Sequence, residues 1–178
     1  VHTLEHYAMQ LSPGWTTHPD RVYFIAEAGV NHNGEIEKAI ALVDVAAESG
    51  ADAVKFQTFD TKALAAENAP KAAYQNRNDD RHANQFDMLK SLELSREDWH
   101  KIYARCADKK IAFLSTPFDL GSADFLEELG VTGFKVSSGD LTYHQLLKSL
   151  AKKGRPVIIS TGMANMGEVE EAVAVIET

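Results

Sequence analysis

The sequence predicts an α/β fold with a parallel sheet, and three observations support this prediction. Short apolar segments alternate with amphipathic helical patterns about every 25 to 30 residues, as expected for strands joined by crossover helices. No hairpin-turn signals separate these segments, and they are apolar almost throughout, as in sheets that are covered on both faces. Each segment ends in polar residues, and α/β folds carry their chemistry at the carboxyl ends of strands.

The first strand is expected at Val22–Ala26. A helix over Glu35–Ser49 should follow, because its apolar residues recur at helical spacing, and Gly50 is a typical residue to end it. The second strand is expected at Ala53–Gln57. Residues 58–85 then form a long polar connection, and connections of this length in compact domains are usually functional or disordered.

The middle of the chain continues the alternation. Phe86–Leu92 is expected as a short helix, and Ser95-Arg-Glu-Asp is a capping-type start for a helix that runs to about Lys109. The third strand is expected at Ile111–Leu114. Asp119–Leu129 should be helical, with a glycine directly after it.

The last expected units are a strand at Gly133–Val136, a helix at Thr142–Lys153 and a strand at Val157–Ile159. A final helix runs from Met166 to the end without a stop signal. About five units fall short of the eight that a closed barrel needs, so an open five-stranded sheet and a barrel cut short both fit. Because the chain also begins with Val1, we expect it to be the front part of a longer protein.

Composition and charge exclude several classes of protein. The chain has 178 residues, 44% of them apolar, and this length and composition suit one packed domain. No apolar run approaches the roughly 18 residues of a membrane span, and the expected irregular lead-in, residues 1–21, has no signal-peptide pattern. A net charge of −8 without a visible basic face argues against nucleic-acid binding.

The single cysteine, Cys106, excludes an internal disulfide and a paired-cysteine metal site. It lies in a helical pattern beside two alanines, so we expect a buried, unreactive thiol. Together with the absence of a leader pattern, this favours a cytoplasmic protein.

Two adjacent stretches, Glu27–Gly34 and Ser49–Gln57, resemble the sialic acid (N-acetylneuraminate) synthase family. Three further stretches agree with that family in register: Asn68–Gln75, Phe134–Asp140 and Ser160–Ala164. The resemblance implies a TIM (β/α)8 barrel, truncated here to about its first five β/α units. Residues 22–178 would then be a partial synthase domain, with the later strands and a C-terminal antifreeze-like domain absent.

The resemblance also implies an activity. Members of the family are transferases that condense phosphoenolpyruvate with N-acetylmannosamine and release phosphate. They use a divalent metal, usually Mn²⁺, whose histidine ligands would lie on strands six and seven, beyond the end of this chain. They act as domain-swapped homodimers and need neither a nucleic acid nor a membrane as a partner.

Phosphoenolpyruvate carries a phosphate and a carboxylate, so its site needs cations and hydroxyl donors. Lys55 and Lys135 lie within otherwise apolar strands, where an unpaired lysine is costly. The resemblance places phosphoenolpyruvate contacts at both lysines, Thr116 and Ser138, and we add Ser160 from its place at the same strand ends. The alternative is that the two lysines extend to the surface and are solvated there.

The sugar side of the site is expected around Glu27, which the resemblance makes a sugar-binding or catalytic carboxylate beside the catalytic Lys55 and Lys135. Gln57, on the same face as Lys55, and Asp140 are expected to contact the substrate. The alternative for Asp140 is a helix cap or turn.

The long polar connection and the turn after the first strand add weaker expectations. Asn76, in the connection near Tyr74, is expected to reach the sugar; the alternative is a disordered surface loop. Asn31-His-Asn-Gly34 predicts a turn with left-handed backbone. His32 has no second histidine at matching spacing, and His82, His100 and His144 suit solvated positions, so no metal ligand is predicted in this chain.

Two alternatives to N-acetylneuraminate synthesis stay open. One is synthesis of a related nonulosonic acid, legionaminic or pseudaminic acid, because much of the sugar pocket would lie outside this chain. The other is a different class, a phosphate-binding barrel fragment without catalysis, as expected if the isolated chain lacks its metal ligands.

Overall fold

Strands and helices alternate along the computed structural model, which describes residues 22–67 and 84–178. The strands are β1 (Ile25–Gly29), β2 (Ala53–Thr58), β3 (Ala112–Pro117), β4 (Phe134–Val136) and β5 (Val157–Ile159). The helices are α1 (Ile36–Glu48), α2 (Thr61–Leu64), α4 (Gln85–Leu92), α5 (Arg96–Lys109), α6 (Leu120–Leu129), α7 (His144–Lys152) and α8 (Met166–Ile176). A 3₁₀ turn, η2 (Ser138–Asp140), precedes α7.

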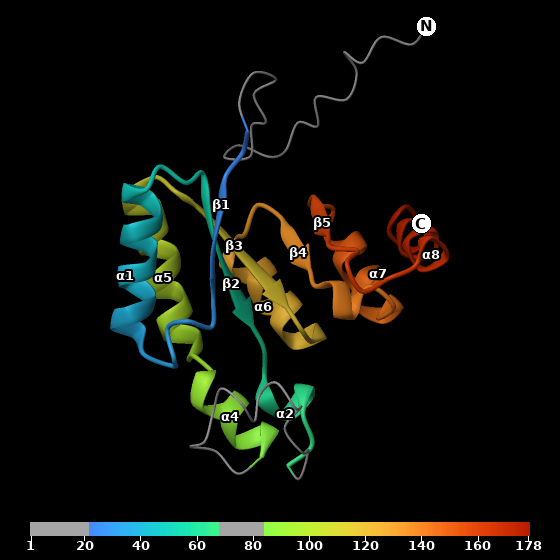
Figure 1. Ribbon diagram of the computed structural model, residues 1–178, viewed down its shortest axis with the longest axis horizontal. Coiled ribbons are helices and arrows are strands. Elements are labelled where there is room, and N and C mark those ends of the chain that lie inside the picture. The colour runs from blue at the N-terminus through green and yellow to red at the C-terminus, as the bar shows by residue number, and fades with distance from the viewer. Residues whose placement is uncertain (1–21, 68–83) are drawn as a thin grey trace, which may run out of the picture.

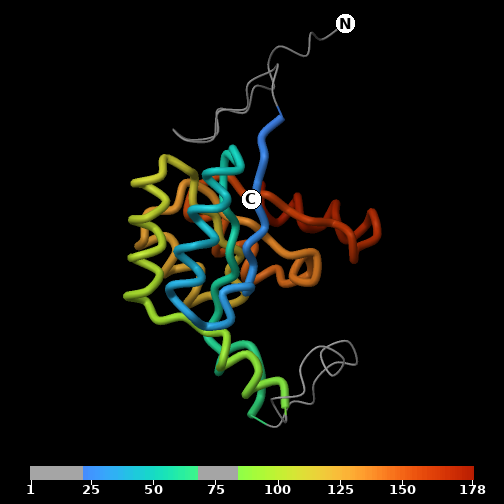
Figure 2. The backbone as a smooth tube through the Cα atoms, turned by 60° about the vertical axis from the view of Figure 1, so that its left-hand side comes forward, coloured from blue at the N-terminus to red at the C-terminus, as the bar shows by residue number. Residues whose placement is uncertain are grey.

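All the strand pairs of the described residues are parallel. Strands β1, β2 and β3 form one sheet in that order, and β4 pairs with β5 beside β3. Helices α1, α5 and α6 pack along one side of the strands, while α2 and α4 project beyond their carboxyl ends (Figures 1 and 2). The predicted parallel α/β architecture is therefore confirmed, and closure into an eight-stranded barrel stays a prediction.

The alternation of side chains along the strands separates two faces. Phe56 of β2, Phe113 of β3 and Phe134 of β4 point outward and join the large core between strands and helices. The opposite, inner face carries a smaller apolar cluster built on two fully buried residues, Ala53 and Leu114. This cluster also includes Tyr23, Ile25, Ala112 and Ile158. Residues two positions after its members along each strand must share its face, because side chains alternate with a period of two.

Several helix ends follow the predicted signals. The side chain of Ser95 accepts a hydrogen bond from the Asp98 amide at 3.1 Å, which begins α5 as expected. Gly130 ends α6 with a φ of 90°, a left-handed conformation that costs glycine little. Helix α8 begins with a capping box between Asn165 and Glu168 and ends at Ile176, just short of the chain's last residue.

Several element boundaries differ from the prediction. Strand β3 runs on to Pro117 and not only to Leu114, and the short helix α2 lies within the expected polar connection. The first strand begins at Ile25 and not at Val22. The Phe24 amide donates a hydrogen bond to the Asp52 carboxylate at 2.7 Å, and register pairing with β2 begins only at the next residue. As a result Glu27 lies within β1 and does not follow it. Helix α7 begins at His144 and not at Thr142, because residues 141–143 form a further turn after η2, in which the Tyr143 amide donates to the Asp140 carbonyl at 2.9 Å.

Burial accounts for the single cysteine. Cys106 lies on the core-facing side of α5 and is 2% exposed. This burial raises the pKa of its thiol to about 12. The prediction of a buried, unreactive thiol is confirmed, because almost no thiolate forms near neutral pH. In the same described part of the chain, no helix is long and apolar enough to cross a membrane.

Candidate functional site

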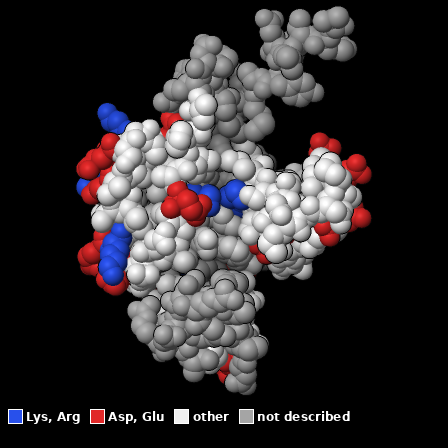
Figure 3. All heavy atoms as spheres, in the orientation of Figure 1, with Lys and Arg blue, Asp and Glu red and all other residues white. Residues whose placement is uncertain are grey.

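An ion pair between Glu27 and Lys55 lies on the inner face of the sheet. The two residues are direct neighbours in the β1–β2 register, and the Lys55 ammonium contacts the Glu27 carboxylate. The Lys55 side chain is 14% exposed, so it does not extend into solvent as the alternative interpretation required. In the space-filling view, acidic and basic side chains lie together in the middle of this face and are bordered by uncharged residues, while the other charged side chains lie toward the edges (Figure 3).

Lys135 reaches the same place from β4. Its Nζ donates hydrogen bonds to the Ser160 hydroxyl and to the Val136 carbonyl, both at 2.6 Å. Burial and then the charge of Lys55 lower the pKa of Lys135, against the opposing charges of Glu27 and Asp140. The two ammonium groups and the Glu27 carboxylate are therefore close enough to act on one another electrically, as the sequence predicted.

Asp140 lies in the η2 turn, next to this group. Burial raises the pKa of its carboxyl, and the charge of Lys135 opposes that shift. Its Oδ2 atom is buried and has no hydrogen-bond partner among the described residues. Of the two alternatives for Asp140, the helix cap is wrong, because α7 begins after Tyr143 without any side-chain cap. The turn is confirmed, because Asp140 closes η2 and its carbonyl accepts the Tyr143 amide at 2.9 Å.

The remaining predicted contacts lie around the charged group. Gln57 and Thr116 are register neighbours on β2 and β3, on the same inner face as Lys55, and Thr116 is 3% exposed. Ser160 follows β5 and donates its amide to Val136 at 3.1 Å, which places its hydroxyl beside Lys135. Ser138 lies in η2, after the end of β4, and is half-buried.

Two predicted features lie outside the described residues: Asn76 and Tyr74, with the connection that carries them. Their expected contact with the sugar stays a prediction. His82 also lies in that segment. Of the other histidines, His100 is exposed on α5 and His144 lies 3.9 Å from the Glu171 carboxylate.

Sequence reasoning missed one structural contributor, Gly29. Its φ is 54°, and the β1–β2 register shifts between Glu27 and Gly29. A Cβ at this position would lie 3.1 Å from Glu27 Oε1 and 3.7 Å from Gln57 Nε2. The glycine two residues after Glu27 was the available signal, since an isolated strand glycine often marks a bulge or a close approach.

The described residues do not supply a metal site. No group of three or more histidine, cysteine, aspartate or glutamate side chains converges within residues 22–67 and 84–178. Glu27 pairs with Lys55, and the charge of Lys135 acts on Asp140. The Mn²⁺ and its histidine ligands stay a prediction.

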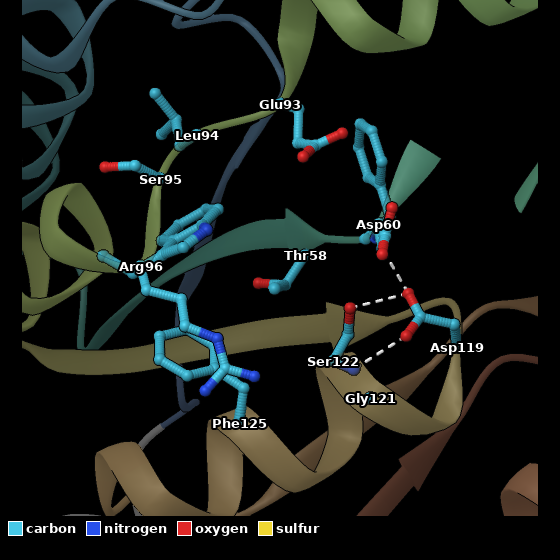
Figure 4. Close-up of a pocket in the computed structure, with 12 residues that line it drawn as sticks. Thr58, Asp60, Glu93, Leu94, Ser95, Arg96, Asp119, Gly121, Ser122 and Phe125 are labelled. Atoms are coloured by element: carbon cyan, nitrogen blue, oxygen red, sulfur yellow. Dashed lines mark hydrogen bonds between the residues drawn. The ribbon is translucent and has the colours of Figure 1, made fainter. Parts of the chain in front are cut away.

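A separate cavity of about 240 Å³ lies on the helix side of β2 and β3 (Figure 4). Arg96 lies over the Phe125 ring along one wall, 4.7 Å from its centroid. The Asp119 carboxylate on another wall accepts hydrogen bonds from the Ser122 amide, the Ser122 hydroxyl and the Asp60 amide, at 2.6 to 2.9 Å. This carboxylate therefore joins the start of α6 to the segment after β2.

Replacing Asp119 with alanine is expected to lower the free energy of unfolding by about 2 to 3 kcal/mol, because it removes a cap and leaves buried donors unpaired. Asp60→Ala is the matched control: it removes only the exposed α2 cap, a bond to the Lys62 amide at 2.9 Å, and should cost about 1 kcal/mol or less. Urea unfolding of both variants measures the difference. Equal losses would contradict the bridging role of Asp119.

The inner-face group can hold a small anion, because two ammonium groups and neighbouring hydroxyls are suited to phosphate or carboxylate oxygens. In fold, the chain is a parallel α/β protein, a class that carries its binding sites at the carboxyl ends of its strands.

The NeuB family model matches residues 42–178, which is more than half of the chain, so the chain belongs to the NeuB family. It is 46% identical over 156 residues to N,N'-diacetyllegionaminic acid synthase of Campylobacter jejuni, covering 88% of this chain and 47% of that protein. It is 48% identical over 151 residues to the Legionella pneumophila enzyme of the same name, covering 85% and 42%.

Among solved structures, the N-acetylneuraminic acid synthetase of Leptospira borgpetersenii, in complex with citrate, superimposes with a TM-score of 0.74 at 31% identity. The alignment covers 89% of this chain and 50% of that one. The chain thus spans about half the length of the relatives it matches. The predicted family is confirmed.

Proposed function

We propose that the complete natural polypeptide containing this chain is a nonulosonic acid synthase that condenses phosphoenolpyruvate with an N-acetylated amino sugar. The observation that carries the proposal is the meeting of Lys55, Lys135 and Glu27 on one inner face at the strand ends. Family membership supports the reaction class. The Mn²⁺ requirement and the homodimer stay predictions for the complete polypeptide.

In this reaction the methylene carbon of phosphoenolpyruvate forms a bond to the sugar's aldehyde carbon. Water then adds to the former enol carbon, and the resulting tetrahedral intermediate releases phosphate by breaking its carbon–oxygen bond. Lys55 and Lys135 hold the phosphate and carboxylate, and offset the negative charge that builds up at the phosphate as it leaves. The same anion would accept hydrogen bonds from the hydroxyls of Thr116, Ser138 and Ser160.

Glu27 would serve the sugar side of the reaction. Its side chain is 54% exposed although it pairs with Lys55, so one part of the carboxylate faces open space above the sheet. A carboxylate there can orient a sugar hydroxyl or move a proton at the aldehyde oxygen. Gln57, next to it on β2, adds an amide for a further hydroxyl. Asp140, whose pKa burial raises, can hold a proton beside Lys135.

For the sugar, we propose the diacetamido hexose that leads to N,N'-diacetyllegionaminic acid, because the two bacterial synthases of that product are 46% and 48% identical to this chain. Sialic acid synthesis from N-acetylmannosamine is the second candidate. The observation that favours it is the likeness in fold to the Leptospira synthetase, at 31% identity.

Phosphate release from phosphoenolpyruvate, assayed with each sugar in turn, tests the proposal. The complete natural polypeptide is expected to show a kcat/KM about tenfold or more higher with the diacetamido sugar than with N-acetylmannosamine, because a site built for a second acetamido group leaves its polar partners unpaired otherwise. The reverse preference would assign the chain to sialic acid synthesis. If neither sugar supports phosphate release with any of a range of divalent metals, the synthase proposal is refuted.

A further inference from the structure

We propose that His32 is a positioning residue that fixes the turn after β1, and through this turn the Glu27 carboxylate, in the geometry that condensation needs. The inference rests on the proposed function for its reaction. It rests on the buried imidazole and its contacts for its geometry. The sequence indicated only a turn here, with a histidine of no assigned role.

The segment between β1 and α1 is a run of three successive reverse turns. The amides of Asn31, Asn33 and Glu35 donate to the carbonyls of Ala28, Val30 and His32, at 2.9 to 3.0 Å. Asn33 and Gly34 both have positive φ, 52° and 75°. A left-handed backbone at a non-glycine residue is uncommon and needs support from surrounding structure.

His32 supplies that support from inside the core. Its side chain is fully buried, and its Nδ1 accepts a hydrogen bond from the Gly34 amide at 3.0 Å. The imidazole lies with its centroid 6.2 Å from Phe56 on β2 and 6.2 Å from Trp99 on α5. One ring therefore ties the left-handed turn to a strand and to a helix.

The protonation state of the ring follows from this bond. Because Nδ1 accepts, it carries no hydrogen, and the neutral ring holds its proton on Nε2. Nε2 is buried and has no hydrogen-bond partner among the described residues. Burial lowers the pKa of His32 and is its sole cause, so no charged group in the described part of β2, α5 or the turn contributes. A second proton would have to enter at Nδ1, where it would displace the Gly34 amide.

The turn links two parts of the site. At its start, the Ala28 carbonyl that accepts from Asn31 is adjacent to Glu27, at the bulge where the β1 register shifts. At its end, Gly34 packs directly on the Ser91 carbonyl of α4. Loosening the turn would therefore release both the backbone behind the carboxylate and its contact with the helix that projects past the strand ends (Figure 1).

Three variants of the complete natural polypeptide separate the roles of the ring. His32→Phe keeps the aromatic volume and removes the acceptor. His32→Asn places an oxygen at the δ position, from which an asparagine commonly accepts a bond from the amide two residues on. His100→Asn changes an exposed histidine on α5 and is the matched control, expected to leave all parameters unchanged.

The two His32 variants are expected to differ from each other in kcat. His32→Phe is expected to lower kcat by about 10- to 100-fold with little change in KM for phosphoenolpyruvate, because the lysines lie on other strands. His32→Asn should recover kcat to within about threefold of the native value, since it restores the bond that shapes the turn. A folded His32→Phe variant with native kcat, or an asparagine variant no better than the phenylalanine one, would overturn the positioning role.

The pH dependence of stability gives a readout that needs no activity. Because the folded-state pKa lies below 6.5, the contribution of His32 to stability is fully present above pH 6.5 and is lost as the pH falls through the folded pKa. The acid loss in urea unfolding should therefore be larger for the native protein than for His32→Asn. Identical acid profiles would contradict the buried neutral ring.

Amide exchange at Gly34 separates the two proposals. The Gly34 amide should be protected in the native protein and in His32→Asn, and exposed in His32→Phe. If condensation is absent from the native protein but this pattern holds, the proposed function fails while the turn-fixing role of His32 stands. If the pattern is absent, the positioning role fails whatever the enzyme catalyses.

Discussion

Replacing Lys135 with methionine in the complete natural polypeptide is expected to lower kcat/KM for phosphoenolpyruvate by about a thousandfold. Lys135 is held at the strand ends by the Ser160 hydroxyl and the Val136 carbonyl, and it shares the inner face with Lys55. Burial and then that neighbouring charge lower its pKa, against the opposing charges of Glu27 and Asp140. A phosphate or carboxylate would relieve this repulsion, and methionine cannot hold either group.

The stability of the Lys135→Met variant should change by less than about 1 kcal/mol, because methionine keeps the aliphatic volume and removes a charge that is costly to bury. Lys148→Met, which removes an exposed lysine from α7, is the matched control and should leave kcat/KM unchanged. Steady-state kinetics with varied phosphoenolpyruvate, together with urea unfolding, provides the measurement. A loss of less than about threefold in a folded Lys135→Met variant would remove Lys135 from the anion site.

The largest expected effect on stability is that of Gly34→Ala, which should lower the free energy of unfolding by about 3 kcal/mol or more. Gly34 has a φ of 75°, which strains any residue with a Cβ atom. An added Cβ would also overlap the Ser91 carbonyl oxygen, and that oxygen belongs to the backbone and cannot rotate away. The turn and the end of α4 would have to move apart.

Gly50→Ala provides the control for this prediction. Its φ of 77° is nearly the same, but an added Cβ would meet nothing within 4 Å. The left-handed strain alone should cost about 1 to 2 kcal/mol. Urea unfolding midpoints of the two variants isolate the effect of close packing, and equal losses would show that the turn does not rest on α4 as described.

Much of the candidate site could be predicted from single residues in the sequence. Lys55 and Lys135 were informative because charged residues inside apolar strands are rare and costly unless paired. Glu27 was informative because no capping pattern explained it. The structure brings these three side chains together, and it adds the Val136 carbonyl as a partner of Lys135, which no side-chain pattern could indicate.

Other features could not be predicted, for a physical reason. The buried contacts of His32 join β1's turn to β2 and α5, which are distant in the chain, and sequence spacing carries no record of such contacts. The same applies to Asp140, because caps, turns and binding sites use the same residue type, and only the structure places it in the η2 turn and away from the start of α7.

The sequence by itself determined the order of the five strands and of the longer helices between them, because hydrophobic periodicity and glycine stops are local properties of the chain. It also determined the family, through motifs that include those around Lys135 and Ser160, within the matched residues 42–178. Tertiary structure alone decided which groups meet: Lys135 with Ser160, Glu27 with Lys55, and His32 with Trp99. Those meetings depend on strand register and helix packing, which arise only when distant segments bury their apolar faces together.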